Sequence, residues 1–164
     1  MIKYFLSLFL LYFIHVLSHM FSIKIINTPI YNSIPIIKLH SIVCLENIIN
    51  KNDDVFFVDF SPFEDISRPD VILKLFQGKK IQGKIRVFCF SKEFSKYIFT
   101  ENNIFENLDT QISNENIKKL ENIDADIVNI ITSWEPSFQV YNRNCRHFSD
   151  YLQKKYILSK VQHF

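Results

Sequence analysis

Apolar residues in this chain are spaced as in strands over its first half and as in helices over its second half. Three runs rich in β-branched and aromatic residues are typical of buried strands. These runs are residues 36–45, 55–60 and 85–90. The loop between the first two runs is short and polar, which favours an antiparallel hairpin. Residues 23–35, interrupted by two prolines, are expected to form an irregular lead-in or an edge strand.

The second half of the chain has two long segments with helical periodicity. Apolar residues recur at three- and four-residue spacing over residues 117–134, and Ser113 is placed to cap this helix. A last helix begins near Cys145, because apolar side chains return at helical spacing beyond it. Shorter helices are expected at residues 70–76 and 92–105. Strands followed by helices predict an α+β domain, with a small antiparallel sheet packed against helices.

The first residues of the chain have the pattern of a targeting segment. Lys3 precedes an apolar run over residues 4–17, and residues 16–18 are small enough for a cleavage site. We therefore expect a signal peptide over residues 1–18, or an uncleaved N-terminal anchor, followed by one domain over residues 23–164. Either outcome places the domain in the secretory pathway, secreted or anchored to a membrane.

The charge pattern argues against a nucleic-acid partner. The chain has 19 Lys and Arg residues against 17 Asp and Glu residues, for a net charge of +2, and the two signs are interspersed. Nucleic-acid-binding domains instead concentrate basic residues on one surface.

Three cysteines leave one thiol over if a single disulfide forms. The secretory pathway permits disulfides. Pairing Cys44 with Cys89 is the arrangement that leaves Cys145 free.

Cys145 lies in the segment Asn144-Cys145-Arg146-His147-Phe148, where a loop turns into the last helix. A helix N-terminus presents unpaired N–H groups and a partial positive charge, which lower the pKa of a thiol. The same N–H groups are the expected donors to an oxyanion. Asn144 is expected to cap this helix, and His147 to form hydrogen bonds within the fold.

A nucleophilic thiol needs a base within hydrogen-bond reach, and His40 is the candidate. His147 lies about 200° around the helix from Cys145 and is expected to point away from it. The remaining histidines lie in or beside the N-terminal segment or in the C-terminal tail. His40 instead lies within an expected strand, where a histidine has no propensity reason to be.

The Asn-Cys-x-His-Phe segment, with a tyrosine before it and an amphipathic helix after it, resembles the nucleophile motif of lecithin retinol acyltransferase-like proteins. That family belongs to the thiol enzymes with a circularly permuted papain fold, which include NlpC-type cell-wall peptidases and the PPPDE peptidases. In the permuted branch a strand histidine comes first and the cysteine follows on a helix, as His40 and Cys145 do here. The resemblance implies a catalytic Cys-His pair with a third polar residue on the neighbouring strand, which corresponds to Asp59.

The resemblance implies a thiol hydrolase or acyltransferase that works through a thioester on a peptide, isopeptide or lipid acyl bond. The acceptor of the acyl group, and the oligomeric state, stay open. The alternative is a catalytically silent interaction domain, with Phe63, Phe76 and other aromatic residues as its binding surface. No cofactor is expected, and no metal site either, because no pair of cysteines has ligand spacing.

Overall fold

The computed structural model describes residues 21–28, 40–47, 54–93 and 114–161, together with Tyr4, Ser7 and Phe9. Most of the expected targeting segment, the Ser113 cap and most of the 92–105 helix therefore lie outside the described residues.

In the described part of the chain, five strands form one antiparallel sheet in the order β1-β2-β3-β4-β5. The strands are β1 (Phe21–Thr28), β2 (His40–Asn47), β3 (Val55–Pro62), β4 (Ile81–Phe90) and β5 (Ser137–Phe138). The predicted hairpin is confirmed, since β2 and β3 pair antiparallel. Residues 23–28 of the segment expected as a lead-in or edge strand lie in β1 at the sheet edge, which begins at Phe21, and the rest of that segment lies outside the described residues.

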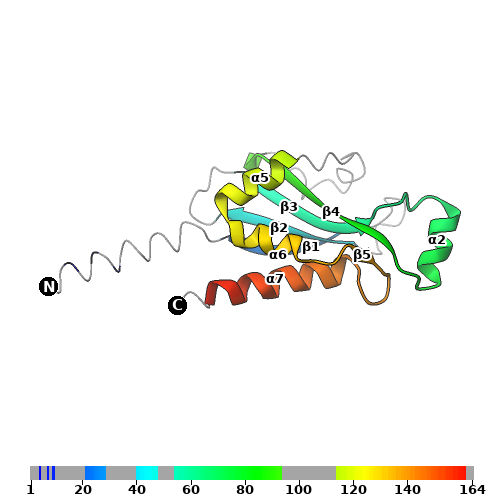
Figure 1. The fold of residues 1–164 in the computed structure, drawn as a ribbon. Coiled ribbons are helices and arrows are strands. Elements are labelled where there is room, and N and C mark those ends of the chain that lie inside the picture. Colours follow the sequence, from blue (N-terminus) through cyan, green and yellow to red (C-terminus); the bar gives the residue numbers. More distant parts are fainter. Residues whose placement is uncertain are drawn as a thin grey trace.

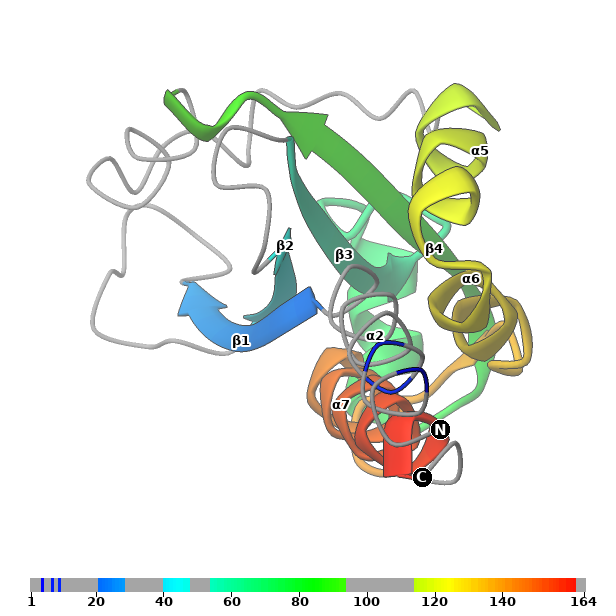
Figure 2. The same ribbon diagram turned by 90° about the vertical axis from the view of Figure 1, so that its left-hand side faces the viewer.

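Helices cover one face of this sheet. The described helices are α2 (Pro69–Phe76), α5 (Asn114–Ile123), α6 (Ala125–Thr132) and α7 (Cys145–Val161). The three later helices lie on one side of the sheet in both views, and α2 lies beyond its end (Figure 1, Figure 2). Apolar residues of β2, β3 and β4 pack there against Ile127, Phe148 and Leu152. The predicted α+β class is confirmed.

The prediction of a single helix over residues 117–134 is wrong, because Asp124 separates α5 from α6. The backbone of Asp124 is extended, and its carboxylate accepts a hydrogen bond from the N–H of Asp126, 3.1 Å away. A side-chain acceptor at this position caps a new helix. The apolar spacing continues through the break, so periodicity alone does not reveal it.

The pairing of Cys44 with Cys89, which the cysteine count left open, does not form, since both thiols are free. Side chains alternate between the two faces of a strand. Cys44 packs with Phe57 and Phe88 in an apolar cluster on one face, while Cys89 packs against the helix-covered core on the other. Burial raises the pKa of the Cys44 thiol to about 12 and that of Cys89 to about 11.

We expect Gly83→Ala to destabilise the fold. A Cβ atom at Gly83 would lie 2.4 Å from the ring of Phe60, which is fully buried. Because the aromatic core around Phe60 is packed, the ring has no space to retreat, and overpacking of this kind costs roughly 1–3 kcal/mol. Urea unfolding of the variant measures the loss. Gly78→Ala is not a neutral comparison, since Gly78 has a φ of +67°, so Ser61→Ala on β3 is the control. An unchanged unfolding midpoint in Gly83→Ala contradicts the packing.

Candidate functional site

The register of the sheet brings the predicted residues His40 and Asp59 together. Asp59 on β3 lies opposite Ile42 on β2, and His40 is two residues before Ile42 on the same face. The His40 Nε2 atom lies 2.8 Å from Asp59 Oδ2. The Asp59 side chain is 1% exposed and the His40 side chain 17%, so the pair is largely removed from water.

The Asp59 carboxylate has a second partner, Arg86, directly opposite it on β4. The Arg86 Nε atom donates to Asp59 Oδ1 at 2.7 Å, and Arg86 Nη2 donates to Oδ2. A bidentate guanidinium fixes the plane of a carboxylate as well as pairing its charge. Although burial works against ionisation, the hydrogen bonds from His40 and Arg86 lower the pKa of Asp59.

Arg86 is not among the residues predicted for the site. It interrupts the otherwise apolar run of the third strand. Asp59 interrupts the second strand in the same way. Two opposite charges, each alone in an apolar strand, are a signal that the strands pair with these residues facing each other, because a buried charge needs a partner.

Cys145 is the first residue of α7, as predicted, and Asn144 caps this helix. Asn144 Oδ1 accepts hydrogen bonds from the N–H groups of Arg146 (3.0 Å) and His147 (3.3 Å). These two donors are therefore taken up by the cap, which removes them from the set expected to hold an oxyanion. The His147 ring is exposed and its Nδ1 lies 2.9 Å from Asn144 Oδ1, so this histidine belongs to the cap.

The start of α7 packs against the start of β2 and places the thiol beside His40. The N–H of Ser41 donates to Cys145 Sγ at 3.4 Å. The pKa of the Cys145 thiol is lowered: burial opposes ionisation, but hydrogen bonding and charge attraction from His40 outweigh it. The pKa of His40 shifts in the opposite direction. Burial lowers it, but hydrogen bonding and charge attraction from Asp59 and Cys145 outweigh burial and raise the pKa of the imidazole to about 9.

The structure thus brings Cys145, His40 and Asp59 into one contiguous group, with Arg86 behind Asp59. Because Nε2 of His40 contacts Asp59, Nδ1 is the nitrogen that remains for the thiol. The two pKa directions favour a thiolate beside an imidazolium at neutral pH. This arrangement provides an activated nucleophile, a proton donor and a group that orients the donor.

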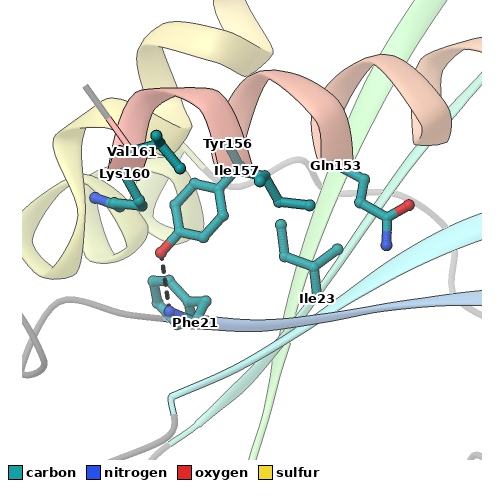
Figure 3. Close-up of a pocket in the computed structure, with 7 residues that line it drawn as sticks. All are labelled: Phe21, Ile23, Gln153, Tyr156, Ile157, Lys160 and Val161. Carbon is teal, nitrogen blue, oxygen red and sulfur yellow. Dashed lines mark hydrogen bonds between the residues drawn. The ribbon is translucent and has the colours of Figure 1, made fainter. Parts of the chain in front are cut away.

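Two cavities lined by described residues lie at the other end of α7. One, of about 260 Å³, lies between β1 and the helix and is drawn in Figure 3. Its lining residues are Phe21, Ile23, Gln153, Tyr156, Ile157, Lys160 and Val161. The other, of about 350 Å³, lies at the junction of α5 and α6. Neither is lined by Cys145, His40 or Asp59, so neither serves as a substrate pocket for the thiol.

An exposed apolar surface lies around α2, which we call the α2 surface. It comprises Phe63, Leu73, Phe76 and Tyr141, each more than half exposed. The Tyr141 hydroxyl donates to the backbone carbonyl of Phe76 at 3.1 Å. Tyr141 is four residues before Cys145, so the α2 surface is connected to the loop that leads to the thiol.

Within the described parts of the chain, no three or more His, Cys, Asp or Glu side chains are grouped so that they could hold a metal ion. None of the described helices combines the length and the apolar character needed to cross a bilayer.

Comparison with known proteins identifies no relative of this chain. No protein-family model matches the chain, and neither a curated protein nor a solved structure is significantly similar to it. Any statement about its chemistry therefore depends on the residues of the site.

Proposed function

We propose that this protein is a thiol hydrolase or acyltransferase with a circularly permuted papain-like fold, in which Cys145 carries the acyl group. The observation that carries the proposal is the contact of Cys145, at the start of α7, with an imidazole that is itself held by a buried carboxylate. A histidine on β2 followed by a cysteine on a late helix agrees with the order expected for the permuted branch.

The reaction has two steps. The Cys145 thiolate attacks the acyl carbon, and a thioester forms as the bond to the leaving group breaks while His40 donates its proton to that group. Neutral His40 then removes a proton from water, an amine or an alcohol, which attacks the thioester and releases Cys145. Asp59 keeps the imidazole oriented in both steps. The acyl bond is that of a peptide, an isopeptide or a lipid.

The direct test is transfer of an acetyl group from p-nitrophenyl acetate to the protein. We expect mass spectrometry of the digested protein to find acetyl on the peptide with Cys145, and Cys145→Ala to abolish this signal. Cys89→Ala is the matched control, since it removes a partly exposed thiol whose pKa is raised rather than lowered. Acetylation that is unchanged in Cys145→Ala would mean that another group is the nucleophile.

The alternative function, an interaction domain on the same scaffold, is favoured by the α2 surface. Phe76 is 76% exposed and adjoins Tyr141, which is also more than half exposed, and grouped exposed apolar side chains mark interaction sites. Lys79 and Lys80 follow α2 and are also exposed. The acetylation experiment separates the two functions, because a folded protein that forms no acyl-Cys145 is not a thiol enzyme of this kind.

A further inference from the structure

Arg86 contacts neither Cys145 nor His40 in the described hydrogen bonds, yet it is part of the same buried network. Its guanidinium donates to both oxygens of Asp59, and one of these, Oδ2, also faces His40 Nε2. The Arg86 side chain is 18% exposed. The orientation of the carboxylate that faces His40 is therefore set from the opposite side by Arg86.

Four groups of this network alternate in charge when the thiol pair is ionised. Arg86 is positive, Asp59 negative, His40 positive and Cys145 negative, and each group touches the next. Each buried charge in such a series is compensated by its neighbour, whereas removal of one member leaves its neighbour unpaired. Asp59 by itself disfavours the Cys145 thiolate, since two negative charges repel. Arg86 neutralises that carboxylate.

We propose that Arg86 is a positioning residue for the thiol pair, which acts through Asp59 to hold the His40 ring toward Cys145. This inference rests on the proposed function. A lysine cannot replace the arginine, because a single ammonium group does not fix the plane of a carboxylate as a planar, two-pronged guanidinium does.

The network predicts how loss of Arg86 changes the thiol. Among the described residues, the charged or titratable groups that face His40 are Asp59 from β3 and Cys145 from α7, with Arg86 from β4 behind Asp59. Without Arg86, the buried Asp59 takes up a proton or turns from His40. The imidazolium then loses its stabilising partner, and the thiolate in turn loses the imidazolium.

The test measures the rate of Cys145 alkylation by iodoacetamide from pH 4 to pH 10, with the peptide that contains Cys145 followed by mass spectrometry. In the full chain we expect fast alkylation at pH 6. Arg86→Gln and Arg86→Lys should each lower this rate at least about tenfold, which corresponds to one unit in the pKa of the thiol. Arg68→Gln is the matched control, because Arg68 also donates to both oxygens of an aspartate, Asp70, but at an exposed position.

A double-mutant cycle separates positioning from a general loss of structure. If Arg86 acts through Asp59, Asp59→Asn and the double variant Arg86→Gln/Asp59→Asn have alkylation profiles that agree within about twofold. The double variant also leaves no buried unpaired charge, so its folding, followed by circular dichroism, is less affected than that of Arg86→Gln.

Two results overturn the inference, and a third addresses the proposed function instead. An unchanged alkylation profile in folded Arg86→Gln would show that Asp59 does not need Arg86 to hold its orientation. An alkylation rate in Arg86→Lys equal to that of the original chain would show that a positive charge alone is sufficient. Slow alkylation of Cys145 at pH 6 in the unmodified chain instead refutes the activated thiol, and with it the function on which the role of Arg86 rests.

Discussion

His40→Ala is expected to lower the rate of Cys145 alkylation at pH 6 by roughly 100- to 1,000-fold. Iodoacetamide reacts with the thiolate, so the rate follows the ionised fraction. Burial raises the pKa of this thiol, and His40 is the main group that offsets the effect of burial. Without the imidazole the pKa returns to or above the ordinary value of a thiol, and about one molecule in a thousand is ionised at pH 6.

The matched control is His147→Ala. His147 is two residues from Cys145 but bonds to Asn144 in the helix cap, so its loss should leave the alkylation rate at pH 6 within a few-fold of the original. Because the pKa of His40 is raised to about 9, the imidazolium persists up to that pH. The thiol of His40→Ala also ionises as the pH rises, so the difference between the rates of the original chain and the variant should shrink toward high pH. Equal rates at pH 6 would contradict the ion pair.

The residues of the site differ in how readily the sequence reveals them. His40 and Cys145 were predicted because each is out of place locally: one is a histidine in an apolar strand, and the other is a thiol at a helix start. Asp59 was predicted only as the third polar residue that the family resemblance implies. Arg86 was missed because its importance depends on strand register, which sets Asp59 opposite it and which a single sequence does not specify. The cysteine count left a Cys44–Cys89 disulfide open for a related reason, since counting ignores the face of the sheet on which each thiol lies.

The boundary between α5 and α6 could not be predicted from the sequence for a similar reason. The apolar spacing over residues 117–134 is continuous, and an aspartate within a helical pattern is ordinarily read as an exposed polar residue. The importance of Asp124 becomes visible only when α7 is placed beside α6. Its carboxylate then meets Tyr156 and Lys160 from a segment more than 30 residues away. Long-range partners of this kind decide where a helix breaks, and local propensity does not.

Asp124→Ala is expected to destabilise the protein by roughly 3–5 kcal/mol, because it breaks a buried polar network. Asp124 accepts a hydrogen bond from the Tyr156 hydroxyl at 2.9 Å and pairs with Lys160 at 3.0 Å. The Tyr156 hydroxyl in turn accepts from the N–H of Phe21, the first residue of β1 (Figure 3). One carboxylate thus joins the cap of α6, the end of α7 and the edge strand.

Asp126→Ala tests whether the effect belongs to burial rather than to charge. Asp126 also pairs with Lys160, at 3.1 Å, but its side chain is 42% exposed, and exposed pairs contribute about 0–1 kcal/mol. Asp124→Asn should fall between the two variants, because the amide oxygen still accepts hydrogen bonds while the charge opposite Lys160 is lost. Urea unfolding ranks the three. If Asp124→Ala unfolds at the same urea concentration as Asp126→Ala, the contacts of Asp124 do not hold β1, α6 and α7 together, and the break between α5 and α6 needs another cause.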